Sequence, residues 1–255
     1  MMNKSIAKAL AILTMLSDKD GEPVKVSVLS ESLGINKATC SRILGTMTNE
    51  GFTERVSRSA GYTLGPNAYC LSRYSKYGGD LIAVCHPIMN YLYKSIGCAV
   101  TLAVIRNNTK YIIDHIDKNN SIFIENFHIS KDDLFTATGF TLLSNLPKSE
   151  LKDLYDNAPD RSKMTYNEML FELSSIRPND TLIIPTHYPD YGVVITDCSS
   201  PLYQNGICVG ALGLAFRRDE NEYDADPGYD ETLRKMLRQA ATEITRRLAL
   251  TAPLV

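Results

Sequence analysis

Residues 26–64 constrain the fold of this chain more than any other segment, because two helical patterns and two strand-like runs follow one another with very short connections. The first run of apolar residues at helical spacing ends at Gly34, a residue type that tolerates the positive φ found where helices end. Asn36 is then a good N-cap for a second amphipathic helix that reaches Thr48. The order helix, tight turn, helix and strand pair is typical of a winged helix-turn-helix, whose second helix enters the major groove of DNA.

The second helix of this segment has a small, polar and cationic outer face. We expect its apolar residues at helical spacing to pack inward, namely Ala38, Cys40, Ile43, Leu44 and Met47. The candidate DNA-binding residues on or beside the outer face are Asn36, Lys37, Thr39, Ser41 and Arg42. Arg can bind guanine bidentately, Ser or Thr can contact a base or a phosphate, and Gly45 allows close approach. The competing interpretation is an ordinary solvated helix with a few outward cations.

The strand pair after this helix carries two further cations. Residues 52–56 and 62–64 alternate as strands, with a turn between them. Arg55 lies in the first strand and Arg58 at the tip of the turn, where a cation reaches a phosphate or the minor groove beside the bound helix. A small helical core covered by a hairpin is the alternative that this pattern leaves open.

The net charge of −2 is divided unevenly along the chain. Residues 1–75 contain nine Lys or Arg against six Asp or Glu, a balance of +3, and the remainder contains eighteen against twenty-three, a balance of −5. A basic amino-terminal part on an acidic body is the distribution expected of a nucleic-acid binder with a separate regulatory domain.

The first quarter of the chain contains a set of short motifs, at residues 5–13, 29–35, 37–39, 42–44, 50–52 and 62–65. Together these motifs resemble the amino-terminal domain of the IclR family of bacterial transcriptional regulators. The resemblance implies an α+β protein in which a winged helix-turn-helix is joined by a linker helix to a GAF-like effector domain with an antiparallel sheet. We expect the DNA-binding domain at 1–65, the linker helix at 66–79 and the effector-binding and oligomerisation domain at 80–255.

Composition agrees with a two-domain chain. A length of 255 residues with 44% hydrophobic residues is enough for two ordinary cores. No apolar run approaches the roughly 20 residues of a membrane span, and the first residues predict an amphipathic helix, 4–17, rather than a signal peptide. We therefore expect a cytoplasmic protein without a membrane partner. The six cysteines form no CxxC pair, which indicates reduced thiols in or near cores.

The rest of the chain predicts a linker helix over 66–77 and then helices alternating with antiparallel strands. The expected helices are 81–96, 149–155, 166–176 and 233–248, and the expected strands are 98–105, 110–116, 121–127, 182–185, 192–196, 199–203 and 207–216. Tight turns at Asn107-Asn108 and Asn205-Gly206 connect two of the strand pairs.

Residues 134–140 are the first candidate for an effector site. The resemblance implies a loop whose backbone amides, at a helix start, bind an effector carboxylate, and this assigns Thr136, Ala137, Thr138 and Gly139. The plain alternative is a helix that begins with small residues.

The resemblance also implies effector contacts from an Asp, a Cys and two Ser on the last strands, and this chain departs from that pattern. Asp197 occupies the position of the Cys, and Gly213 and Ala215 occupy the positions of the two Ser. A carboxylate in a dry pocket repels a carboxylate ligand, so a cationic or hydroxyl-rich effector is favoured if Asp197 points inward. A rim position for Asp197 is the alternative, since successive strand residues alternate sides.

No pattern supports catalysis, a cofactor or a metal. Isolated cysteines and histidines could be paired on paper, namely Cys198, Cys208, His115, His128 and His187, but no spacing links them into a mechanism. Cys85-His86 matches no zinc-site spacing. We therefore expect a non-enzymatic regulator that binds a palindromic operator in double-stranded DNA as a homodimer or dimer of dimers and responds to a small-molecule effector. Repression and activation are both open, and a metabolic enzyme or ligand-binding module is the competing class.

Overall fold

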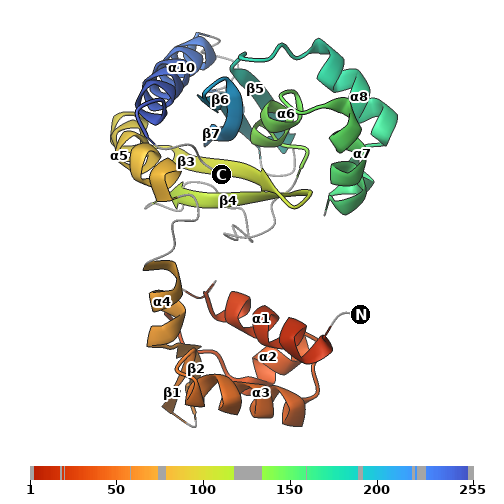
Figure 1. The fold of residues 1–255 in the computed structure, drawn as a ribbon, viewed down its shortest axis with the longest axis vertical. Coiled ribbons are helices and arrows are strands. Elements are labelled where there is room, and N and C mark those ends of the chain that lie inside the picture. The colour runs from red at the N-terminus through yellow and green to blue at the C-terminus, as the bar shows by residue number, and fades with distance from the viewer. Residues whose placement is uncertain are drawn as a thin grey trace. The chain divides into compact units, whose positions relative to one another are not determined.

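The computed structural model describes residues 3–17, 19, 21–57, 59–73, 79–117, 134–158, 160–188, 192–219, 222 and 228–251. The contacts of the chain divide it into two compact units, residues 1–77 and 78–255, which are labelled by element in Figure 1. The strand predicted at 121–127, Arg58 and the end of the predicted linker helix at 74–77 lie outside the described residues.

The first unit contains the predicted helices and strand pair in the predicted order. Its elements are α1 (Lys4–Ser17), α2 (Val26–Ser32), α3 (Lys37–Asn49), β1 (Thr53–Ser57), β2 (Gly61–Leu64) and α4 (Pro66–Arg73). Gly34 has a φ of 60° at the break between α2 and α3, as the sequence predicts. The core of the unit is formed by fully buried residues of the first three helices, namely Ile12, Leu16, Leu29, Cys40 and Leu44.

The strand pair is tied to the loop between α1 and α2. Val24 and Tyr62 exchange backbone hydrogen bonds of 2.8 and 2.9 Å, so Val24 extends the pair as an isolated bridge. Gly61 has a φ of 111°, and a Cβ there would lie 2.1 Å from the Val24 carbonyl oxygen. Only glycine fits at this position, because both the backbone angle and the close approach exclude a side chain.

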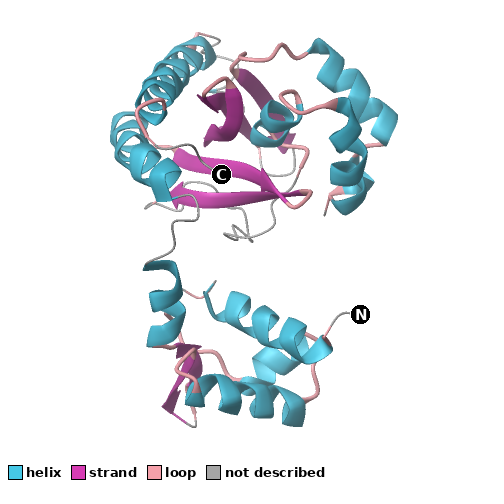
Figure 2. Cartoon of the chain, viewed as in Figure 1, coloured by secondary structure: helices cyan, strands magenta, loops and turns pink. Residues whose placement is uncertain are grey.

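The second unit is an antiparallel five-stranded sheet in the order β4-β3-β7-β6-β5 with helices on both faces (Figure 2). The strands are β3 (Ala99–Arg106), β4 (Thr109–Ile116), β5 (Leu182–Tyr188), β6 (Val193–Gln204) and β7 (Ile207–Asp219). The helices are α5 (Gly79–Ile96), α6 (Ala137–Leu143), α7 (Lys148–Asn157), η1 (Arg161–Lys163), α8 (Tyr166–Ser175) and α10 (Tyr229–Leu248). The predicted mixed α+β architecture is confirmed.

The two faces of the sheet differ in side-chain size. Alternate residues of the central strands, such as Leu102 and Leu214, pack with α5 and α10 in the larger core. The residues between them are small and face α6, namely Ala99, Thr101 and Ala103 of β3 and Ala211, Gly213 and Ala215 of β7. Because side chains on adjacent strand positions point to opposite faces, this alternation lets α6 lie close to the sheet.

One prediction for this sheet is wrong. The sequence analysis expects two strands, 192–196 and 199–203, whereas β6 is a single strand that pairs with β5 on one side and with β7 on the other. The predicted break falls at Asp197 and Cys198. In the structure these two residues pair with Ile184 and Ile183 of β5 and with Ala215 and Leu214 of β7, so the ladder continues through them. The Asn turns are confirmed, with positive φ at Asn107, Asn108, Asn205 and Gly206.

Candidate DNA interface and effector cavity

The second helix of the helix-turn-helix, α3, is fixed at its start and along its inner face. The Asn36 side-chain oxygen accepts hydrogen bonds from the backbone amides of Ala38 (2.9 Å) and Thr39 (3.4 Å), so the predicted N-cap is present. Cys40, Leu44 and Met47 are buried. These contacts determine which side of α3 faces solvent.

The outer face of α3 is a continuous exposed stripe. Ala38, Ser41, Arg42, Thr46 and Asn49 are all exposed and recur at spacings of three and four residues. Gly45 lies within the stripe, and a Cβ built on it meets nothing within 4 Å. The surface that α3 can present to a DNA groove is therefore flat and polar at its centre, with the guanidinium of Arg42 beside Gly45.

The expectation that Ala38 packs inward is wrong, because its side chain is exposed. Ala38 precedes Ser41 and Arg42 by three and four residues, which puts it on the same face as they are. Alanine occurs on both buried and exposed faces of helices, so the apolar pattern could not determine which face Ala38 occupies.

The other candidate DNA-binding residues surround this stripe. Lys37 is exposed at the start of α3 and Thr39 is half-buried. Arg55 is exposed on β1, with its guanidinium carbon 5.7 Å from the centroid of the Tyr62 ring on β2. This ring supports the arginine over the strand pair, since a cation over an aromatic face is attracted by its quadrupole. Arg58 lies outside the described residues.

A small cavity of about 70 Å³ lies between α6 and strands β3, β4, β6 and β7. It is lined by six of the seven candidate effector residues, namely Thr136, Ala137, Thr138, Asp197, Gly213 and Ala215. Gly139 is not among them. Thr101, which the sequence analysis did not single out, also lines the cavity. The fold therefore brings together residues that lie more than 75 positions apart in the sequence.

The loop before α6 is held by a buried carboxylate. Asp160 is 4% exposed and accepts hydrogen bonds from the backbone amides of Leu134 and Phe135, both at 2.9 Å. Thr136 is the N-cap of α6 and accepts from the Gly139 amide at 3.3 Å. A Cβ on Gly139 would lie 1.8 Å from the Leu134 carbonyl oxygen, so this glycine allows the turn to pack and its amide serves the cap.

Gly213 stands where the family resemblance implies the first serine, and threonines from other elements fill the space beside it. A Cβ on Gly213 would lie 2.5 Å from the Thr101 hydroxyl oxygen and 2.6 Å from the Thr138 methyl carbon. No side chain fits at residue 213 unless these threonines move. Thr101 of β3 thus supplies a hydroxyl group where β7 supplies none, and Thr138 of α6 supplies a methyl group.

Asp197 lies on the cavity face of β6, half-buried, opposite Ala215 of β7. Its neighbour Cys198 is fully buried in the core beneath α10, and burial raises the pKa of this thiol to about 12. Burial raises the pKa of the Cys85 and Cys98 thiols to about 12 as well. Burial thus favours the protonated form of these thiols, so Cys198 lacks the lowered pKa of an activated cysteine.

Lys110 is a residue near the cavity that the sequence analysis missed. It is 2% exposed, and its ammonium nitrogen donates to the Thr136 hydroxyl at 2.6 Å. Its position beside the Asn107-Asn108 turn suggests an exposed lysine. The signal that could have identified it is the alternation of β4, which puts Lys110 on the same face as the buried Ile112.

The histidines predicted as possible catalytic partners gain no support. Burial lowers the pKa of His115 below its usual 6.5, and His128 and the side chain of His187 lie outside the described residues. Within the described ranges, no group of three or more His, Cys, Asp or Glu side chains could hold a metal ion. No helix in the same ranges is long and apolar enough to cross a membrane.

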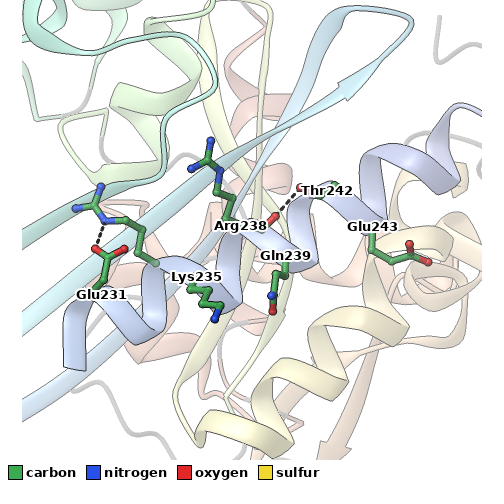
Figure 3. A pocket seen from close by; sticks show the side chains of 7 residues that line it. Glu231, Lys235, Arg238, Gln239, Thr242 and Glu243 are labelled. Atoms are coloured by element: carbon green, nitrogen blue, oxygen red, sulfur yellow. Dashed lines mark hydrogen bonds and ion pairs between the residues drawn. The ribbon is translucent and has the colours of Figure 1, made fainter. Parts of the chain in front are cut away.

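A larger hollow of about 470 Å³ runs along the outer side of α10 (Figure 3). Its lining residues all come from this one helix, and they include an i,i+3 ion pair of 3.3 Å between Glu231 and Arg234. Because no second element contributes groups to it, this hollow is the solvated face of a helix. The smaller cavity, where four strands and a helix converge, is therefore the candidate effector site.

Comparison with known proteins gives the same family for the amino-terminal unit that the sequence motifs suggest. Residues 5–57 match the IclR helix-turn-helix domain. The acetate operon repressor of Salmonella typhimurium is 27% identical over 115 residues, which are 44% of this chain and 42% of that protein. The regulator TtgV of Pseudomonas putida is 23% identical over 148 residues, 58% of this chain and 56% of TtgV. The match thus spans about half the length of these relatives.

The fold of the whole chain is similar to that of solved structures. An IclR homologue from Microbacterium hydrocarbonoxydans, crystallised with 4-hydroxybenzoate, has a TM-score of 0.74 with 15% identity, and the match covers 97% of this chain and all of that one. At this identity the likeness concerns the fold alone. The resemblance inferred from the sequence motifs is confirmed.

Proposed function

We propose that this chain is an IclR-type transcriptional regulator, because residues 5–57 match the IclR helix-turn-helix domain. It binds operator DNA, and a small molecule in the α6 cavity controls this binding. The observation that carries the proposal is the exposed stripe of α3, which has a low centre at Gly45 and a guanidinium from Arg42. A helix of this shape fits the major groove, which is about 12 Å wide. The curated relatives are a repressor and a regulator, and we propose repression here.

Asn36 caps α3, and each of the other six candidate DNA-binding residues has a contact role in this proposal. Ser41 and Arg42 read base edges, while Lys37 and Thr39 contact base or phosphate at the start of α3. Arg55 and Arg58 hold the flanking backbone or the minor groove. Residues 1–65 form the DNA-binding domain, 66–79 the linker and 80–255 the effector and oligomerisation domain of a cytoplasmic regulator.

We propose that the chain acts as a homodimer or dimer of dimers on a palindromic site. Large apolar side chains are exposed on the first unit: Ile6 and Leu10 of α1 are each 58% exposed and one turn apart, and Tyr69 and Leu71 of α4 are 60% and 66% exposed. A second copy is the simplest cover for such surface. A two-fold axis then places the α3 helices about 34 Å apart, or a multiple of that distance.

The cavity favours a small effector with a cationic or hydroxyl group. Its volume of about 70 Å³ is well below the several hundred Å³ of common ligand pockets. Asp197 accepts from a ligand donor, and the hydroxyls of Thr101 and Thr138 both donate and accept. A simple carboxylate is disfavoured near Asp197, because like charges repel strongly where water is excluded. The ligand shifts operator affinity only if it binds the two arrangements of the DNA-binding units unequally.

Titration of duplex DNA against the full chain tests DNA binding. DNA that co-purifies with the protein supplies the duplexes, and affinity should fall steeply with salt because phosphate contacts release counterions. Arg42→Ala should lower discrimination between this site and random DNA by about 1–3 kcal/mol, whereas Arg58→Ala should weaken all sequences evenly. Arg177→Ala, which removes an exposed cation from the second unit, is the matched control. Salt-independent binding, or equal loss in the control, contradicts the proposal.

Thermal shift tests the effector class separately. Small amino alcohols and polyols should stabilise the wild-type chain, and Asp197→Ala should abolish this effect. Stabilisation by simple keto acids that is undiminished in Asp197→Ala rules the proposed ligand chemistry out and leaves DNA binding untouched.

A further inference from the structure

The carboxyl end of α3 is closed by a glycine and by a residue from the linker helix. The amides of Gly51 and Phe52 donate to the carbonyls of Thr48 and Met47, at 3.0 and 2.8 Å, in a Schellman motif with Gly51 at a φ of 72°. The carbonyls of Glu50 and Gly51 directly follow the last residue of α3 and take no part in this motif.

Asn67, in the first turn of α4, binds both of these carbonyls. Its side-chain amide nitrogen donates to the Glu50 carbonyl at 2.7 Å, and its backbone amide donates to the Gly51 carbonyl at 2.9 Å. The amide of Gly65 adds a third hydrogen bond, of 2.9 Å, to Phe52. One residue of the linker helix therefore caps the end of the helix that is proposed to read DNA.

Two glycines allow the segment that starts α4 to lie directly against the segment that ends α3. A Cβ on Gly65 would lie 2.5 Å from the Gly51 carbonyl oxygen, and a Cβ on Gly51 would lie 2.9 Å from the Asn67 side chain. The two segments therefore meet backbone to backbone. Two hydrogen bonds from Asn67 in the first turn of α4 and one from Gly65, directly before it, leave little freedom for rotation of α4 against α3.

We propose that Asn67 is the positioning residue that fixes the direction of α4 relative to α3, so that the linker helix and the DNA-reading helix move as one rigid body. A change in the direction of α4 then turns α3 by the same angle, and the spacing of half-sites that a dimer accepts is set by α4. The part that concerns DNA rests on the proposed function, whereas the rigidity does not.

A spin-label distance measurement on the full chain tests the rigidity. Cys70 on α4 is exposed and takes one label, Thr46→Cys on the outer face of α3 takes the other, and Cys208→Ser removes the partly exposed thiol. Dilution with unlabelled chain suppresses distances between copies. We expect one narrow distance in the wild type and at least a twofold broader distribution in Asn67→Asp, which has the same shape but cannot donate to Glu50.

Matched variants exclude charge and general destabilisation as causes. Asn67→Ala removes the donor without adding charge and should broaden the distribution as well. Asn49→Asp adds the same charge at the last residue of α3, at an exposed side chain, and should leave the distance narrow. A distribution in both Asn67 variants as narrow as in the wild type overturns the inference, whether or not the chain binds DNA.

A series of duplexes with half-sites moved apart one base pair at a time tests the consequence for DNA. The wild type should prefer one spacing, and Asn67→Asp should reduce this preference about fivefold while its affinity for a single half-site stays unchanged, as expected for the loss of one hydrogen bond. A broadened label distance with an unchanged spacing preference refutes the role of Asn67 in operator geometry. Failure of the wild type to bind any duplex refutes the proposed function, and the label distances still decide the rigidity.

Discussion

Substitution of Gly45 by alanine should raise stability and lower DNA affinity at once. Gly45 lies in the interior of α3, and a Cβ on it meets nothing within 4 Å. Alanine is favoured over glycine inside a helix by about 0.8–1.0 kcal/mol, and no contact opposes this gain. For a unit the size of residues 1–77, a gain of about 1 kcal/mol raises the unfolding midpoint by about 4–8 °C.

The same methyl group should weaken DNA binding, because Gly45 is the low centre of the exposed stripe of α3. A side chain at this position holds the helix away from the base edges and disturbs the contacts of its neighbours Ser41 and Arg42. Loss of one base contact costs about 1.4 kcal/mol, which is about a tenfold loss of affinity. An ordinary destabilising mutation cannot give this combination of effects.

Circular dichroism melts and duplex titrations of the same preparations measure the two effects. Gly34→Ala is the matched control in the same unit, because its Cβ also meets nothing within 4 Å but its φ is 60°. This control should lose about 1 kcal/mol or more, since L-residues avoid the left-handed region. A lower midpoint in Gly45→Ala refutes the reasoning about open space, and unchanged affinity refutes close approach of α3 to DNA.

Three further substitutions test separate parts of the fold. Asn36→Ala removes the cap of α3 and should cost about 1 kcal/mol in urea unfolding, and a neutral result contradicts the role of the cap. Gly139→Ala forces a methyl against the Leu134 carbonyl and should cost about 3 kcal/mol or more, with loss of any ligand-induced thermal shift as the accompanying sign. Burial lowers the pKa of His115 below 6.5, so the folded state holds it neutral while the unfolded state takes up a proton below about pH 6.5. The stability that neutral His115 contributes is therefore fully present above pH 6.5 and is lost as the pH falls. His115→Gln should flatten the fall of the free energy of unfolding between pH 7.5 and 5.5, and an unchanged slope against pH contradicts this role of His115.

The first unit could be predicted from the sequence because local residues determine its boundaries. Gly34 requires a positive φ, Asn36 caps the next amides, and the apolar spacing orients each short helix toward one small core. These signals act within a few residues and need no knowledge of distant contacts. Ala38 is the exception, because a methyl group is compatible with either face of α3.

The cavity could be predicted only in part, because it depends on contacts between distant segments. The family resemblance identified α6 and the last strands, but not Thr101, which β3 places opposite Gly213. Nor did the sequence indicate that a lysine is buried beside the helix cap, since Lys110 follows an exposed turn. The break expected at residues 197 and 198 of β6 is excluded only by the pairing of β6 with both neighbouring strands, which the sequence does not reveal.

The small side chains on the α6 face of the sheet have a consequence for how relatives of this protein diversify. The walls of the cavity at Thr101, Thr138 and Ala215 differ from serine or glycine counterparts by single methyl groups. The bulky core under α5 and α10 is built from alternate residues of the same strands, on the opposite side. Changes of single side-chain groups on one side of the sheet can therefore alter which ligand the proposed cavity accepts, while the core residues on the other side remain unchanged.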